Sequence, residues 1–337
     1  MNKLLALLKS IRWSFKFSFD ICNEIFRING KDKNTTLTIA RSIALNNQLK
    51  RLASTGSGNN AFYAYHQFRE VQEFCLKYNH IPKNVLEIGT GSNLAILALF
   101  LHSTAIKAYG LDIEPLDDRY DIDLYETLKE FLKAAGGTNW YQYASEHKPN
   151  PYASFPTSID HVDFKEYVDQ IEYFAPCGAD KIPLADNAID LFYSISTLEH
   201  LPKTRESIQE MKRLLVNGGL SIHEIDLSYH RHHPNRLEHL KYSEEDWQRA
   251  TNQYGEGLGV DDIWRGKFTN EIFCNRLRTS DFVELFSESG FEILEVTPII
   301  KFDTSKIDKS SLDKKFQKKT LEDLSITNAI IVTRCKK

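Results

Sequence analysis

The stretch NVLEIGTGSNLAILALFL, residues 84–101, joins a short apolar strand to an apolar helix through a glycine-rich turn. Strand–turn–helix units of this kind are typical of parallel α/β sheets, in which ligands bind where the strand ends. Gly89 and Gly91 let the backbone approach a ligand closely, because a Cβ would clash there. Glu87 stands beside the turn, and a fixed anion repels phosphate but tolerates a cationic ligand.

A second signal closes the next expected strand, about 20 residues after the turn. There the sequence reads GLDIE, residues 110–114, with Asp112 at its centre. A carboxylate in this place can accept hydrogen bonds from both hydroxyls of a ribose. Taken together in strand–turn–helix–strand order, the two signals predict a site for an adenosine-containing ligand.

Short apolar strands continue to alternate with helices along the rest of the chain, as in a parallel α/β sheet. A glycine follows two of the expected helices, and each is expected to stop there, at Gly218-Gly219 and at Gly290. The expected strands are 84–88, 106–113, 171–175, 189–195, 219–226, 291–297 and 328–334. The expected helices are 61–79, 94–101, 124–135, 203–216 and 280–289.

Four motifs together resemble those of class I S-adenosylmethionine-dependent methyltransferases, in the same order. They are VLEIGTGSN (85–93), GLDIEP (110–115), IPLADNAIDLFYSISTLEHL (182–201) and EMKRLLVNGG (210–219). The LEHL and GG elements are similar to the subgroup that acts on small molecules. The resemblance implies a Rossmann-like sheet of seven strands with helices on both faces, whose last strand, 328–334, runs antiparallel.

The resemblance covers residues 84–226 and extends through 270–297. It implies S-adenosylmethionine as the cofactor and methyl transfer to an oxygen or nitrogen of a small-molecule or glycan-type acceptor. A rival interpretation is a nicotinamide-dependent oxidoreductase, which shares the glycine turn and the ribose carboxylate. Glu87 and Asn93 disfavour it, because Asn93 replaces a glycine that brings the helix close to a pyrophosphate. A second rival is a catalytically inactive cofactor-binding partner subunit.

Positions in the cofactor site follow from the same resemblance. Asp112 would hold the ribose, Ile113 would pack on the adenine, and the glycine turn would border the methionine part. The segment Ser194–Thr197 would line the sulfonium side. The complete set of cofactor-binding residues that the resemblance implies is Glu87, Gly89, Thr90, Gly91, Asn93, Asp112, Ile113, Asp180, Ser194 and Ser196.

Two positions depart from the family pattern. Asn93 stands where many members have a third glycine, so the turn is expected to be less tight. The acidic residue expected near the adenine amino group is shifted, because Asp180 comes about one place late.

His200 is the first candidate catalytic residue. A neutral imidazole can take a proton from a substrate hydroxyl or amine near neutral pH. The alternative is that the Glu-His pair only packs the start of the next helix, and alignment of the two substrates carries the reaction. Asp226 and His230 are further catalytic or substrate-binding candidates, since they follow a strand at the edge where ligands bind.

The segment 221–234 is unusually rich in histidine, which raises the question of a metal. It contains no HExxH or comparable ligand spacing and straddles a strand end and a loop. We therefore expect it to line the substrate pocket, with a solvated loop as the alternative, and predict no metal site.

The predicted catalytic domain spans residues 61–337, with cap insertions at 115–170 and 227–278. The first insertion carries aromatic residues, among them Trp140 and Tyr152. Such residues are expected to form the core of the cap, with a cage around a cationic ligand as the alternative.

Residues 1–28 are predicted to form an amphipathic helix, and 29–60 a polar linker. Period-two alternation over 13–19 leaves a strand as an alternative. The helix is expected to dock its apolar face on the catalytic domain or on a second copy of the chain. Its early lysines keep peripheral membrane contact open as a second hypothesis.

The overall composition is that of an ordinary globular protein of 337 residues. The net charge is −4 and the pI about 6.3, which disfavours nucleic acid as a partner. The five cysteines are scattered, with no CxxC pair, which argues against a disulfide framework or a zinc site. The pattern is typical of a protein of the reducing cytoplasm.

Overall fold

A seven-stranded sheet runs through the part of the chain that the computed structural model describes, namely residues 61–116, 119–134, 163–231, 233–251 and 273–337. The strand order is β3-β2-β1-β4-β5-β7-β6, and β7 is antiparallel to both of its neighbours. This confirms the predicted Rossmann-like sheet with an antiparallel last strand. The strands are β1 (Asn84–Ile88), β2 (Lys107–Leu111), β3 (Glu172–Phe174), β4 (Ile189–Ile195), β5 (Leu215–Asp226), β6 (Phe291–Lys301) and β7 (Ile326–Cys335).

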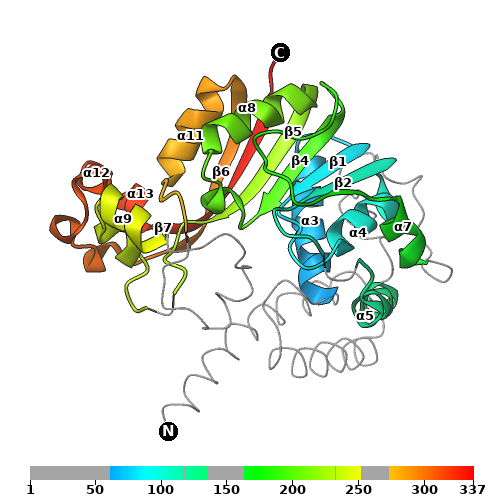
Figure 1. Cartoon of the computed structure of the whole chain (residues 1–337), viewed down its shortest axis with the longest axis horizontal. Coiled ribbons are helices and arrows are strands. Elements are labelled where there is room, and N and C mark those ends of the chain that lie inside the picture. The colour runs from blue at the N-terminus through cyan, green and yellow to red at the C-terminus, as the bar shows by residue number, and fades with distance from the viewer. Residues whose placement is uncertain (1–60, 117–118, 135–162, 232, 252–272) are drawn as a thin grey trace, which may run out of the picture.

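Two layers of helices sandwich the sheet (Figure 1). One layer consists of α3 (Ala61–Lys77), α4 (Ala95–Ser103), α5 (Ile122–Ala134) and α7 (Phe164–Gln170), and the other of α8 (Thr204–Leu214) and α11 (Thr279–Glu288). Successive strand residues alternate between the two cores, because side chains of a strand point to opposite faces. Val85 packs with the first layer and Leu86 with the second. Both are fully buried, so the sheet is covered on both sides.

The expected helix stop at Gly218-Gly219 is wrong. The helix α8 ends at Leu214, and the chain passes directly into β5 at Leu215. Leu215 pairs with Ile189, and the next paired residue of β5 is Leu220, so the strand bulges in between. Gly218 adopts a positive φ of 84° within that bulge. The glycines therefore permit a strand irregularity rather than a helix end.

A smaller lobe lies at one end of the sheet and contains α9 (Glu244–Thr251) and α13 (Leu321–Ser325) (Figure 1). The lysine-rich stretch 301–319 belongs to it and forms two 3-10 turns and the short helix α12 (Lys314–Gln317). Leu312 and Phe316 from this stretch are buried. Their neighbours in this third hydrophobic cluster are Leu237, Leu240 and Leu324. The stretch is thus a folded part of the lobe, with lysines on its outer surface.

Several predictions concern residues outside the described ranges. They are the helix of 1–28, the linker of 29–60 and the aromatic cap residues of 135–162. The central part of the second insertion, 252–272, also lies outside. Within the described ranges, no helix has both the length and the apolar character needed to cross a membrane.

Candidate active site

The glycine turn after β1 is joined to the end of β2 by backbone and side-chain hydrogen bonds. The Gly89 N–H donates to the Leu111 carbonyl at 2.8 Å, and the Gly91 N–H donates to an oxygen of the Asp112 carboxylate at 2.9 Å. Both glycines have positive φ, 74° and 64°, which favours glycine. The two predicted signals therefore meet at one edge of the sheet.

Asp112 is held in place by the backbone around it. Its second oxygen accepts from the Glu114 N–H at 3.0 Å, and burial raises the pKa of its carboxyl. Ile113, the next residue, is 64% exposed although it is strongly apolar. A Cβ added at Gly91 would meet no atom within 4 Å, so there is open space at the turn. A fixed carboxylate, an apolar surface and open space thus lie side by side.

Glu87 is the buried carboxyl beneath this turn. It is 3% exposed and accepts a hydrogen bond from the Tyr193 hydroxyl at 2.8 Å. Burial raises the pKa of Glu87 to about 8, and the nearby Asp112 carboxylate acts in the same direction. A cation bound beside it would favour its ionised form. Glu87 therefore lies beside the turn as predicted, but it is largely protonated near neutral pH and is not a fixed anion in the free protein; its role next to a cationic ligand stays a prediction.

The end of β4 packs against the glycine turn. A Cβ added at Gly89 would lie only 2.2 Å from the Thr197 hydroxyl oxygen, so the two residues are in direct contact. Ser196 is exposed, with a φ of 47°, and its N–H donates to the Glu224 carbonyl at 2.9 Å. Ser194 is buried, and its hydroxyl lies 2.8 Å from Nδ1 of His223. Of the two predicted serines, only Ser196 has an open side chain.

The remaining predicted cofactor residues lie at the rim of this region. The Asn93 side-chain oxygen accepts from the N–H of Ala95, the first residue of α4, at 3.0 Å, a bond that a glycine at position 93 could not make. Thr90 is buried, with its methyl group against Gly110. Asp180 is at the surface in an ion pair of 2.7 Å with Lys203, and this pair holds the pKa of Asp180 below its ordinary value.

His200 lies at the start of the loop that follows β4. Its Nδ1 is 2.7 Å from the Phe273 carbonyl oxygen, so Nδ1 carries the proton and Nε2 keeps its lone pair. Burial lowers the pKa of His200 to about 4. The imidazole is therefore neutral at physiological pH, but such a low pKa reduces the driving force for taking a proton from a substrate. Its role as a general base stays a prediction.

His230 and Asp226 come together with His200, as their shared sheet edge predicts. The two imidazole rings lie 4.8 Å apart, and Nε2 of His230 is 3.7 Å from the Asp226 carboxylate. Sequence reasoning missed Glu199, which joins the same group. Its Oε1 accepts from the Asp226 N–H at 3.2 Å, and burial raises the pKa of its carboxyl well above the ordinary range. The only signal for it was its place next to His200.

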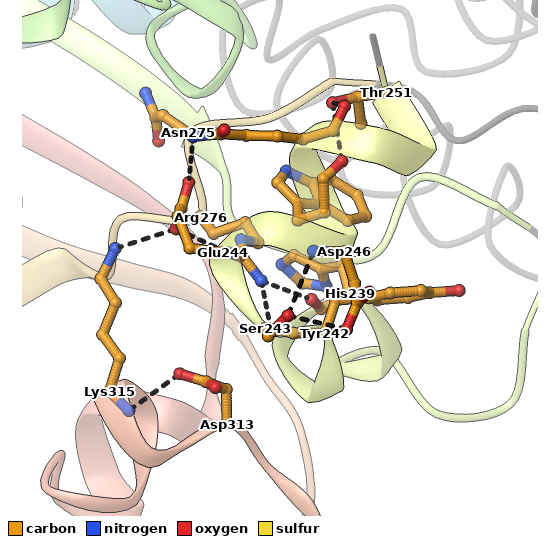
Figure 2. Close-up of polar contacts among 12 residues, drawn as sticks. His239, Tyr242, Ser243, Glu244, Asp246, Thr251, Asn275, Arg276, Asp313 and Lys315 are labelled. Carbon is orange, nitrogen blue, oxygen red and sulfur yellow. Dashed lines mark hydrogen bonds and ion pairs between the residues drawn. The ribbon is translucent and has the colours of Figure 1, made fainter. Parts of the chain in front are cut away.

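The segment 273–278 holds this group in position, and it too was missed. The Asn275 N–H donates to the Glu199 carbonyl at 2.7 Å, and its side-chain amide donates to the Leu198 carbonyl at 2.7 Å. Figure 2 shows Arg276 reaching from the same segment to Glu244, at 2.7 Å. Arg276 is buried, and it also donates to the carbonyl of Tyr242 at 2.7 Å.

Arg278 fixes the other end of the segment. Its guanidinium is fully buried and donates to four backbone carbonyls, and burial lowers its pKa to about 10. The four acceptors belong to Leu227, Asp323, Leu324 and Ile326. Two buried arginines in a short polar segment, NRLR at 275–278, were the available sequence signal, because arginine is rarely buried without a specific set of partners.

A model of the methyltransferase domain family matches residues 60–296. This match confirms the class predicted from the four motifs, an S-adenosylmethionine-dependent methyltransferase, and it argues against the nicotinamide-dependent alternative. A search of curated protein sequences found no significant match.

Solved structures with a related fold include two S-adenosylmethionine-dependent methyltransferases. The one from Methanosarcina mazei is 16% identical, with a TM-score of 0.41, and the match covers 78% of this chain and 97% of that chain. The one from Mesorhizobium loti is 13% identical, with a TM-score of 0.37, and the match covers 75% of this chain and 90% of that chain. Similarity this distant carries no information about the substrate.

Proposed function

This chain belongs to the methyltransferase domain family, and we propose that it transfers the methyl group of S-adenosylmethionine to an oxygen or nitrogen of a small-molecule or glycan-type acceptor. The observation that supports a working site is the contact between Gly89 and Thr197. It joins the turn that would carry the methyl donor to the segment that leads to His200. In the proposed arrangement, the donor would lie on one side of this contact and the acceptor on the other.

The residues at the turn fit the proposed cofactor. The Asp112 carboxylate accepts from the backbone N–H groups of Gly91 and Glu114, and a carboxylate has further acceptor capacity for a ribose hydroxyl. Ile113 offers exposed apolar surface for the adenine. Glu87 provides a carboxyl near the sulfonium and ammonium groups, where its ionised form becomes favourable.

The proposed reaction is an in-line displacement. A lone pair of the acceptor oxygen or nitrogen attacks the methyl carbon, the carbon–sulfur bond breaks, and its electron pair stays on the sulfur of S-adenosylhomocysteine. Holding the two substrates in line would provide a large part of the reduction in the activation barrier. Nε2 of His200 would take the acceptor proton, and Asp226 and His230 would orient it or the acceptor. A catalytically inactive cofactor-binding subunit is the alternative that turnover would exclude.

Calorimetry and labelling test the proposal together. The purified chain should bind S-adenosylhomocysteine and should not bind NAD. Incubation of metabolite pools with methyl-labelled S-adenosylmethionine should produce a labelled product, and mass spectrometry would identify the acceptor. Binding of NAD without S-adenosylhomocysteine would reverse the assignment. Cofactor binding with no labelled product from any pool would favour the inactive subunit.

A further inference from the structure

Three potential metal ligands converge beside the acceptor side of the proposed site. Glu199, His200 and His230 each offer one ligand atom, and these atoms all lie within 4.8 Å of one another. Glu199 and His200 come from the turn after β4, and His230 follows β5. His230 is distant in sequence from Glu199 and His200, so the spacing rules that argued against a metal in 221–234 did not cover this combination.

The Glu199 carboxyl gives a second, independent indication of a cation-binding site. Its side chain is 2% exposed, and Oε1 accepts from the Asp226 N–H. Its Oε2 is buried and has no hydrogen-bond partner among the residues that the structure describes. A buried carboxyl oxygen without a partner is costly, and a bound cation would pair with it in its ionised form.

The surroundings of the two histidines match those of metal-binding imidazoles. Such an imidazole usually donates its second N–H to a carbonyl or a carboxylate, which fixes the ring. Nδ1 of His200 is bonded to the Phe273 carbonyl, which leaves Nε2 as its ligand atom. Nε2 of His230 lies 3.4 Å from the Asp226 carbonyl and 3.7 Å from its carboxylate. The rings are thus oriented in advance by groups that are not themselves ligands.

We propose that Glu199, His200 and His230 bind a first-row divalent metal ion, such as Zn²⁺ or Fe²⁺, and that the ion holds the methyl acceptor through a hydroxyl oxygen. Two histidines and one carboxylate are a known ligand set for such ions and leave coordination positions open. The role in the reaction rests on the proposed function above, whereas the binding of the metal does not. This proposal reverses the expectation of no metal site.

In this arrangement Nε2 of His200 binds the ion and does not act as the general base, so the ion would account for deprotonation of the acceptor. A metal lowers the pKa of a bound hydroxyl, so its proton leaves to solvent near neutral pH. The oxygen then attacks the methyl carbon of S-adenosylmethionine as the carbon–sulfur bond breaks, and S-adenosylhomocysteine leaves. The ion keeps its oxidation state throughout. The proposal therefore narrows the acceptor to a hydroxyl compound.

Metal binding is tested directly on the full chain, stripped with EDTA and titrated with Zn²⁺ or Mn²⁺ by calorimetry. We expect about one ion per chain. His230→Ala should weaken binding by more than the ~10–100-fold that loss of an outer partner costs. His233→Ala is the matched control, because His233 lies in the same segment but is exposed and outside the group. Equal binding by both variants, or none by the wild type, would overturn the proposal.

Two further measurements keep the outcomes distinct. Co²⁺ added to the wild-type chain should give d–d absorption bands in the visible range, and this test needs no variant; absence of bands would count against the site. S-adenosylhomocysteine affinity is measured on the same samples. A chain that binds the cofactor and methylates an acceptor in EDTA disproves the metal and leaves the function intact. A chain that binds the metal but neither binds the cofactor nor methylates an acceptor supports the metal site and disproves the proposed function.

Discussion

The two sides of the proposed active site are built in different ways. The donor side, at the ends of β1 and β2, consists of residues 87–113, which fold back on each other through backbone hydrogen bonds. The acceptor side joins the loop after β4, the segment after β5 and the segment 273–278. The first is local in sequence and the second is assembled over long range. Chemistry that is local in sequence can be recognised from a motif, whereas an assembled site becomes visible only when the fold is known.

If the acceptor side depends on long-range assembly, removing its main anchor should have the largest effect. Arg278→Leu leaves buried carbonyls without donors and should lower the free energy of unfolding by about 3–5 kcal/mol. Chemical denaturation measures this change. Arg205→Leu is the control, because its pair with Glu288 is exposed and is worth ~0–1 kcal/mol. Similar losses for both variants would show that the buried guanidinium is no anchor.

The second-largest effect expected is on turnover, which should depend on the acceptor side. His200→Ala should lower kcat by ~10²-fold or more while the affinity for S-adenosylhomocysteine stays unchanged, because the imidazole lies on the acceptor side. Steady-state kinetics with the identified acceptor, together with calorimetry, provide both numbers. If kcat does not change, the histidine is structural and substrate alignment alone carries the reaction.

The reverse pattern is expected on the donor side. Asp112→Ala should weaken cofactor binding by ~1–3 kcal/mol, since it removes a charged acceptor for the ribose hydroxyls. Asp169→Ala, on the exposed surface of α7, controls for a general effect of charge. Isothermal calorimetry compares the two variants. An unchanged affinity in Asp112→Ala would mean that the ribose binds elsewhere.

The smallest effect expected is a pH dependence on the donor side. Burial raises the pKa of Glu87 from an ordinary value of 4.5 to about 8. Between these two values the folded protein keeps a proton that the unfolded chain has lost, so the free energy of unfolding falls as pH rises through this window. Binding of the cationic cofactor would displace that proton. The affinity for S-adenosylmethionine should therefore rise with pH, by less than about tenfold between pH 7 and pH 8, and level off above pH 8.

The variant Glu87→Gln tests the origin of this dependence. It keeps an acceptor for the Tyr193 hydroxyl but cannot ionise, so its affinity profile should be flat between pH 6 and 9 if Glu87 is the titrating group. A profile like that of the wild type would assign the titration to another carboxyl, of which Asp112 is the nearest candidate.

The strands and the donor side could be predicted because both depend on local patterns. β1 and β4 begin and end at the predicted residues, since each is a short apolar run bounded by polar or turn residues. Glu199 could not be identified as a site residue from the sequence, because its contacts are with Asp226 and Asn275, which are distant in sequence. Gly218 misled the prediction because a positive φ is needed in a strand bulge as well as at a helix end.

The contact between Gly89 and Thr197 has a consequence for substrate range. In the proposed site this contact lies between the donor turn and the acceptor side, so volume added at one of the two residues is taken from the other. Thr197 is the side that can change, because Gly89 also needs its positive φ. A smaller residue at 197 would open space next to Gly89 without altering the turn. Diversification of acceptors within this fold can therefore proceed at position 197 while the donor turn is preserved.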